Sequence, residues 1–164
     1  MEFKKVLINE IKDIEELSNL ATSIVREHFD PIIGKKQNDY MLNMFQSVPA
    51  ICEQLKNGYN YYFVCDESKR KIGFLAFYPR ENELYLSKFY LIKSERGKGI
   101  SKKMLNFVVT KARELGLNSI ILNVNRNNSA IYAYEKLGFH KIREEKNSIG
   151  NGFIMDDYVY SYNI

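Results

Sequence analysis

Apolar positions along the chain switch between helical and strand spacing, and this order of segments predicts an α/β fold. Segments with apolar residues every three or four positions alternate with short runs in which almost every residue is apolar or aromatic. The predicted elements are a strand at 4–8, helices at 13–30, 39–47 and 50–57, strands at 59–65, 72–78 and 83–92, a helix at 102–115, a strand at 119–124, a helix at 130–137, and strands at 139–149 and 153–162.

Local signals set the expected ends of the first helices. Asp13 and Glu16 resemble a capping box at the start of the first helix, and Pro31 is expected to end it because the residue before a proline avoids the α conformation. Residues 31–38 are therefore expected to form a loop. The second helix is expected to place one apolar face inward, made of Tyr40, Met41, Met44, Phe45 and Val48.

The middle of the chain predicts how the strands pair. The strands at 59–65, 72–78 and 83–92 follow one another through short polar turns, which predicts an antiparallel meander. The strand at 83–92, the helix after it and the apolar strand at 119–124 form a βαβ unit with parallel strands. The prediction is an α+β mixed sheet of about seven strands, flanked by about four or five helices, in a single domain of residues 1–164.

Composition narrows the classes of protein that fit. Of the 164 residues, 45% are apolar and 27% are charged, and no apolar run approaches a membrane span of roughly 18 residues. A cytoplasmic protein without a membrane partner is expected. Cys52 and Cys65 are expected to be buried and reduced, and two distant histidines give too few ligands for a metal site.

The net charge of +4 is compatible with a polyanionic partner or a phosphate-rich small molecule. The basic residues alternate with Asp and Glu, so a mixed, solvated surface is favoured over a nucleic-acid interface. A basic protein with 12 tyrosines could still bind nucleic acid, although it carries no recognisable nucleic-acid motif.

A glycine-rich turn between the strand at 83–92 and the following helix suggests an anion site. The first backbone N–H groups of a helix lack partners and carry partial positive charge, and glycines let a phosphate approach the backbone. The spacing fits neither a P-loop nor a dinucleotide fingerprint, and a tight turn with solvated lysines is the alternative. The turn reads Arg96, Gly97, Lys98, Gly99, Ile100, Ser101 and Lys102.

Two segments resemble the acyl-CoA-binding motifs of the GNAT N-acetyltransferase superfamily. These are RGKGIS after FYLIKSE and, about 25 residues later, NVNRNNSAIYAYEKLGF. The family's first motif is Arg/Gln-x-x-Gly-x-Gly/Ala, and Ser101 is a departure at its last position. The element order also matches the GNAT fold over essentially the whole chain, so the resemblance implies acetyl transfer from acetyl-CoA to an amine, without a metal.

The resemblance implies roles for particular residues. The pantetheine arm of acetyl-CoA would lie along the strand backbone at Phe89, Tyr90 and Leu91, and the Leu91 N–H would stabilise the oxyanion. The pyrophosphate would accept N–H groups of the turn, from Arg96 through Lys102. Asn128 would hold the pantetheine amide, and the small Ala130 would leave room for the thioester.

Tyr134 is the residue that the resemblance implies as the general acid, which would protonate the departing thiolate. It lies one helical turn after Ala130, whereas Tyr132 points roughly the opposite way. A buried tyrosine that only packs against the sheet is the alternative interpretation.

The general base and the acceptor stay open at this stage. Tyr85 occupies the position where many relatives carry an acid, and Glu27, Asp30, Glu81 and Glu83 are only weak candidates. Asp156 and Asp157 would suit a cationic acceptor, such as a small amine or a peptide N-terminus. A non-catalytic acyl-CoA sensor of the same fold remains the alternative, and a homodimer is possible.

Overall fold

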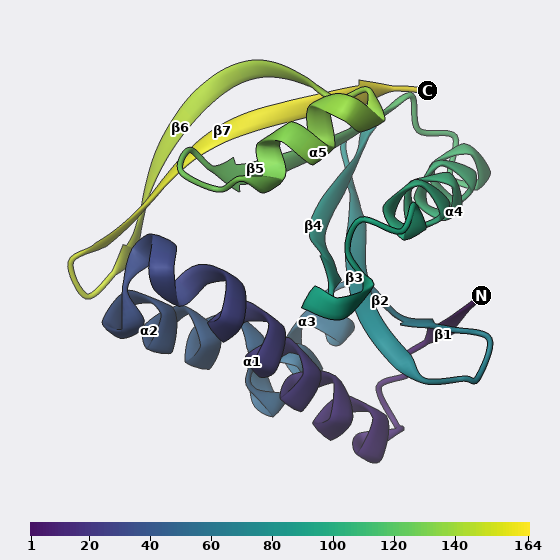
Figure 1. The fold of residues 1–164 in the computed structure, drawn as a ribbon, viewed down its shortest axis with the longest axis horizontal. Helices are drawn as coiled ribbons and strands as arrows, with labels where there is room; N and C mark the ends of the chain where they lie inside the picture. The colour runs from purple at the N-terminus through teal and green to yellow at the C-terminus, as the bar shows by residue number, and fades with distance from the viewer. The chain divides into compact units, whose positions relative to one another are not determined.

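The structure is a computed structural model that describes residues 1–164. It contains seven strands, five α-helices and a short 3-10 helix (Figure 1). In chain order these are β1 (Glu2–Lys5), α1 (Ile11–Ile33), α2 (Lys35–Gln46), α3 (Val48–Lys56), β2 (Asn60–Cys65), β3 (Lys71–Arg80), β4 (Glu83–Leu91), η1 (Lys93–Glu95), α4 (Ile100–Glu114), β5 (Ser119–Asn125), α5 (Ala130–Leu137), β6 (His140–Gly150) and β7 (Phe153–Asn163).

The strands form one mixed sheet in the order β1-β2-β3-β4-β5-β7-β6. β4 and β5 are parallel, with Leu84 opposite Ile120, as the βαβ prediction requires. The pairs β1–β2, β2–β3, β5–β7 and β6–β7 are antiparallel. The predicted fold class, strand number and helix number are therefore confirmed.

The chain forms two compact units, and the first comprises Met1–Tyr78 and Lys88–Ser101. In this unit α1, α2 and α3 pack against one another. Its core joins apolar residues of α1 and α3 to those of β2 and β3, and these side chains are almost fully buried. The core includes Ile14, Leu17, Ile51, Phe63 and Phe74.

The second unit comprises Pro79–Ser87 and Lys102–Ile164. Here β5 lies between β4 and β7, and Ile120, Ile121 and Leu122 are buried, as a central strand predicts. The hairpin β6–β7 extends from this sheet (Figure 1), and β6 is its edge strand, with almost every residue exposed.

Pro31 does not end the first helix, so the predicted end at Asp30 and the predicted loop at 31–38 are wrong. α1 continues through Pro31 to Ile33, and α2 begins at Lys35. Gly34, with φ +84°, reverses the chain between them, and its N–H donates to the Asp30 carbonyl. The proline rule is a bias rather than a prohibition, and a helix can continue for its last turn after a proline.

The start of α1 and the position of β1 also differ from the prediction. α1 begins at Ile11 after Glu10, without a side-chain cap, so Asp13 lies in the first turn rather than at the N-cap. β1 spans Glu2–Lys5 and not 4–8, because its register pairs Phe3 with Val64 of β2.

The inward face of α2 is more polar than its sequence predicts. The helix buries Asn38, Leu42 and Gln46, whereas Met44 is exposed. The nitrogens of both buried amides have partners: the Asn38 amide donates to the Asp30 carboxylate at 2.6 Å, and the Gln46 amide donates to the Phe45 carbonyl at 2.6 Å. Apolar periodicity does not reveal these hydrogen bonds, so the buried amides could not be predicted from it.

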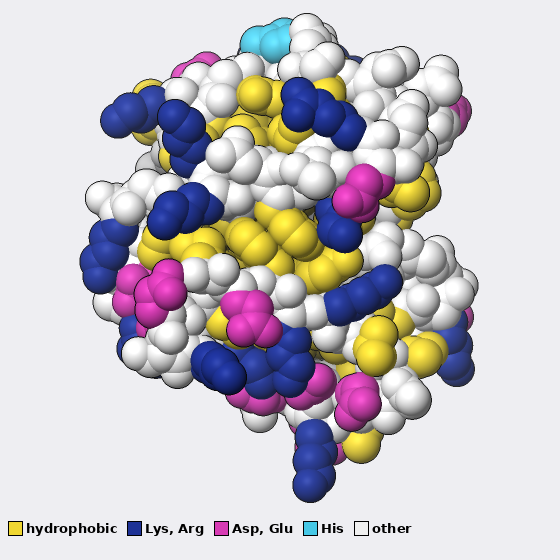
Figure 2. Space-filling model, turned by 90° about the vertical axis from the view of Figure 1, so that its right-hand side faces the viewer, with side chains coloured by type: hydrophobic (Ala, Val, Ile, Leu, Met, Phe, Trp, Pro, Cys, Tyr) yellow, Lys and Arg dark blue, Asp and Glu magenta, His cyan; other side chains and the backbone are white.

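The molecular surface mixes charges of both signs. Figure 2 shows Lys and Arg side chains interspersed with Asp and Glu on the face that it displays. No helix is long and apolar enough to cross a membrane. Both cysteines are free thiols; Cys65 is buried, as predicted, whereas Cys52 is only partly buried.

Candidate functional site

The glycine-rich turn joins the end of β4 to the first turn of α4. Sequence reasoning missed the 3-10 helix η1, which follows β4 and precedes Arg96. Gly97 and Gly99 both have φ +78°, a conformation that other residues rarely adopt. A Cβ built on either glycine meets no atom within 4 Å, so open space lies in front of the turn. The start of α4 and this space fit the phosphate groups of a CoA ligand.

The Arg96 side chain is engaged within the first unit. Its guanidinium donates to the Leu91 carbonyl at 3.0 and 3.2 Å and lies 2.7 Å from the Glu27 carboxylate of α1. Arg96 therefore fixes the end of β4 against α1.

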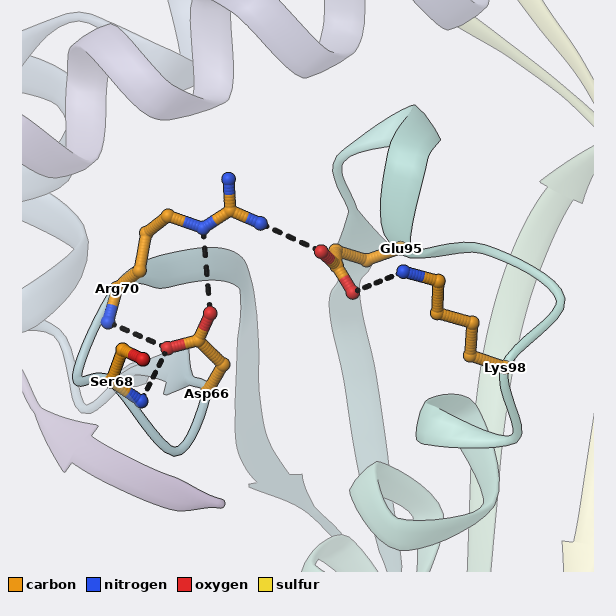
Figure 3. A network of polar contacts seen from close by, with 5 residues as sticks. All are labelled: Asp66, Ser68, Arg70, Glu95 and Lys98. Atoms are coloured by element: carbon orange, nitrogen blue, oxygen red, sulfur yellow. Dashed lines mark hydrogen bonds and ion pairs between the residues drawn. The ribbon is translucent and has the colours of Figure 1, made fainter.

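A second ion-pair network holds Lys98 (Figure 3). Glu95 accepts hydrogen bonds from Lys98 at 3.2 Å and from Arg70 at 2.6 Å. Arg70 also contacts Asp66, whose carboxylate accepts the backbone N–H groups of Ser68 and Arg70 at 2.9 Å each. These bonds hold the pKa of Asp66 below its usual range. The network joins the glycine-rich turn to the turn between β2 and β3.

The end of β4 lies unusually close to β3 at Gly73. A Cβ on Gly73 would lie 2.3 Å from the Tyr90 carbonyl oxygen and 2.9 Å from Leu91 Cδ2. The Tyr90 ring packs between Phe74 and Phe29, at centroid distances of 5.4 and 6.0 Å. Sequence reasoning missed Gly73, and its only sequence signal is a lone glycine inside a strand.

In the second unit, Asn128 is hydrogen-bonded to the first turn of α5. It is 5% exposed, and its side-chain oxygen accepts the Ala130 N–H at 2.9 Å. The Asn128 carbonyl also accepts the Ile131 N–H at 3.2 Å. Asn128 and Ala130 are thus held together at the helix N-terminus by a hydrogen bond that was not predicted from the sequence.

The two tyrosines of α5 have different environments. The Tyr134 side chain is partly buried and its ring contacts Phe139 edge to face at 5.7 Å, whereas Tyr132 is 76% exposed. Burial raises the pKa of the Tyr134 hydroxyl above its usual range, so the hydroxyl stays protonated at neutral pH. A protonated phenol is what a proton donor requires.

A polar network in the second unit was not predicted. The Asn123 amide donates to Glu145 at 3.2 Å and to Asp157 at 3.4 Å, and its oxygen accepts the Tyr85 hydroxyl at 3.0 Å. Asp157 is 3% exposed, and burial raises the pKa of its carboxyl. Asp156, in contrast, pairs with Arg126 at 2.8 Å. The two aspartates therefore have different environments despite being neighbours.

The predicted site residues divide between the two units. The first unit holds Phe89, Tyr90, Leu91 and the turn through Ser101, and the second holds Lys102, Asn128, Ala130 and Tyr134. No group of three or more His, Cys, Asp or Glu side chains is arranged to hold a metal ion.

A comparison with models of protein families shows to which family the chain belongs. The model of the acetyltransferase (GNAT) domain matches residues 31–159, which is most of the chain. The chain belongs to the GNAT acetyltransferase family. The match includes β4, the glycine-rich turn, α4 and α5.

Two curated proteins resemble this GNAT chain in part. The uncharacterized N-acetyltransferase YdgE of Bacillus subtilis is 31% identical over 87 residues, which cover 49% of this chain and 55% of YdgE. A ribosomal-protein-alanine N-acetyltransferase of Haemophilus influenzae is 30% identical over 81 residues, covering 49% of this chain and 56% of that protein. The chain thus spans about half the length of the curated relatives that it matches.

Solved structures share the fold at low identity. The PaiA N-acetyltransferase of Thermoplasma acidophilum, solved in complex with coenzyme A, has a TM-score of 0.80 and 19% identity, covering 99% of this chain and 98% of that chain. A GNAT acetyltransferase of Staphylococcus aureus has a TM-score of 0.71 and 21% identity, covering 99% of both chains. At such identities the likeness establishes the fold alone.

Proposed function

We propose that this protein is an N-acetyltransferase that moves the acetyl group of acetyl-CoA to a primary amine. The acceptor would be a small cationic molecule or a peptide N-terminus. The observation that supports this most directly is the glycine-rich turn at the start of α4, with two glycines at φ +78° and open space before them. Membership of the GNAT family and the coenzyme A complex of the PaiA relative support the same cosubstrate.

The chain's own residues would bind and orient acetyl-CoA. Backbone N–H groups of the turn would bind its pyrophosphate, and the backbone of Phe89 and Leu91 would align the pantetheine arm. Acetyl-CoA supplies the activated thioester. The Leu91 N–H would stabilise the oxyanion that forms on attack, an interaction worth a few kcal/mol in other acyl-transfer sites.

Tyr134 would donate the proton that the departing thiolate needs. A tyrosine hydroxyl is protonated at neutral pH, and burial of the Tyr134 hydroxyl raises its pKa and keeps it in the neutral, proton-bearing form. Amine attack requires a neutral nucleophile, and an ordinary alkyl amine is almost wholly protonated at neutral pH. Of the weak candidates for the base, Glu27 pairs with Arg96 and Asp30 accepts from Asn38, so both are already engaged.

Acids of the second unit support a cationic acceptor. The carboxyl groups of Asp157 and Glu145 both accept hydrogen bonds from the Asn123 amide. In addition, one structure with the same fold is a chimeric spermidine N-acetyltransferase. That relative is 18% identical to this chain, so its substrate serves here only as a member of the test panel. The second candidate function, a non-catalytic acyl-CoA sensor, would share the turn but would not need the Tyr134 hydroxyl.

The test is acetyl-CoA-dependent thiol release against polyamines, aminoglycosides, amino acids and peptides. Tyr134→Phe is compared with Tyr132→Phe, a matched change on the exposed side of the same helix. We expect Tyr134→Phe to lower kcat at least tenfold while acetyl-CoA binding persists, because only the proton donor is removed. Tyr132→Phe should retain wild-type rates.

Three results would count against the proposal in different ways. Equal loss in both tyrosine variants would remove Tyr134 from the chemistry. Binding of acetyl-CoA without turnover of any amine would favour the sensor. Failure to bind acetyl-CoA would refute both the assignment of acetyl-CoA as the cosubstrate and the proposed function.

A further inference from the structure

Lys88 differs from every other partly buried cation in the chain. Five Lys and Arg residues are partly buried. Four of them form an ion pair with a carboxylate: Arg26 with Asp39, Lys71 with Glu16, Lys111 with Glu114 and Arg126 with Asp156. No carboxylate lies within ion-pair distance of Lys88. Its Nζ instead lies 5.6 Å from the centroid of the Phe45 ring of α2.

An ammonium group removed from water is costly unless a carboxylate compensates for the lost hydration. The ring of Phe45 offers only a weak attraction, of roughly 0.5–1 kcal/mol for such contacts. The alternative is loss of the proton, and burial lowers the pKa of Lys88 to about 8. Lys88 therefore carries a neutral amine far more often than an ordinary surface lysine.

The place of Lys88 on β4 gives that amine a reaction partner, if the proposed function is correct. Lys88 directly precedes Phe89, the first residue proposed to align the pantetheine arm. The pyrophosphate would be held beyond the end of β4, so the arm would run back along the strand and its acyl end would point toward Lys88. Three residues of strand separate Lys88 from Leu91, about 10 Å, so a thioester held between them would lie within reach of the flexible lysine stem.

We propose that Lys88 is a self-acetylation site, at which the protein transfers the acetyl group of its own bound acetyl-CoA to the Lys88 side chain. The Nζ lone pair attacks the thioester carbonyl carbon, an N–C bond forms and the C–S bond breaks. The amine gives up a proton and the thiolate takes up one, so the products are Nε-acetyl-lysine and CoA with a free thiol. The modification replaces a titratable cation beside Phe45 with a neutral amide.

The test uses the full-length protein, isotopically labelled acetyl-CoA at pH 7.5, and peptide mass spectrometry. Lys71 is the internal control because it is also partly buried on a neighbouring strand but is paired with Glu16. A pKa of about 8 instead of 10.5 makes the neutral fraction of Lys88 roughly two hundredfold larger at this pH. We expect Lys88 to be labelled at least tenfold faster than Lys71, in first order and independently of protein concentration.

Two further samples exclude simple chemical acetylation. Desulfo-CoA, which occupies the cosubstrate site without a thioester, should abolish labelling of Lys88 and leave the slow labelling of other lysines unchanged. Lys88→Arg should remove the label, whereas Lys71→Arg should leave Lys88 labelled at the wild-type rate. Melting temperatures of both variants show whether they are folded.

Each other outcome overturns the inference. Labelling of Lys88 no faster than Lys71, or labelling that desulfo-CoA does not affect, means that Lys88 is not a site of transfer. Turnover of an external amine without a label on Lys88 leaves the proposed function intact and removes only the self-acetylation. Failure of acetyl-CoA to bind by calorimetry removes both.

Discussion

Gly73→Ala tests how closely β3 must approach the end of β4. The new Cβ would lie 2.3 Å from the Tyr90 carbonyl oxygen, and real contacts do not fall below 3.0 Å. The obstacle is backbone, so the flexible end of a side chain cannot simply move away. β4 must therefore shift outward at the residues proposed to hold acetyl-CoA.

The expected loss follows from overpacking. Inserting a methyl group into a filled site costs about 1–3 kcal/mol, and each kcal/mol lowers Tm by about 2–4 °C in a protein of this size. Gly73→Ala should therefore melt roughly 2 to 12 °C below wild type. Because misplacement of a reacting group by about 1 Å can cost up to a hundredfold, kcat/KM for acetyl-CoA should fall at least tenfold.

Gly116→Ala is the matched control. Gly116 has φ +71° and no atom within 4 Å of a built Cβ, so alanine there adds backbone strain of about 1–2 kcal/mol without a clash. Its melting temperature should fall by a similar amount while kcat/KM for acetyl-CoA stays within twofold of wild type. Wild-type melting of Gly73→Ala would refute the close approach, and lowered melting with unchanged kcat/KM would refute the role of β4 in binding.

Two further changes have defined outcomes. Gly99→Ala places a side chain in the open space before the turn at φ +78°, so acetyl-CoA affinity measured by calorimetry should fall at least tenfold; undiminished affinity would contradict the pyrophosphate assignment. Asp157→Asn should raise the melting temperature at pH 7.5, because burial raises the pKa of Asp157 and its charged form therefore costs stability in the folded state. This gain should shrink as the pH falls through the raised pKa and disappear below the ordinary value of 3.8, where the wild-type carboxyl is protonated in both states. A gain that persists at low pH would mean that something other than charge burial is responsible.

The sequence predicted the sheet well because its signals are local. The apolar run of β5, the turn between β2 and β3, and the glycines that close α4 and α5 each depend on a few neighbouring residues. The same is true of the turn at Gly97 and Gly99, where the expected backbone was found. These parts of the fold could be read before any tertiary contact was known.

The parts that could not be predicted depend on partners distant in sequence. Glu27 and Arg96 are 69 residues apart, so nothing in either segment indicates that they pair. Gly73 matters because of Tyr90, and Asn123 because of Asp157. The polar face of α2 has the same origin, since Asn38 can be buried only where Asp30 and the Val25 carbonyl accept its amide.

Two basic side chains of the glycine-rich turn, Arg96 and Lys98, are paired with carboxylates in the fold. In sequence, Arg96 and Lys98 suggest attraction by side-chain charge, but Glu27 and Glu95 pair with them in the folded first unit. Ion pairs as exposed as these contribute about 0–1 kcal/mol to stability, so their main effect is to fix side-chain positions. If the turn binds a phosphate, the backbone N–H groups at the start of α4 and the helix dipole would contribute more of the attraction than the paired side chains of Arg96 and Lys98. The left-handed backbone at Gly97 and Gly99, which glycine adopts without strain, is therefore the feature that distinguishes this turn from an ordinary basic loop.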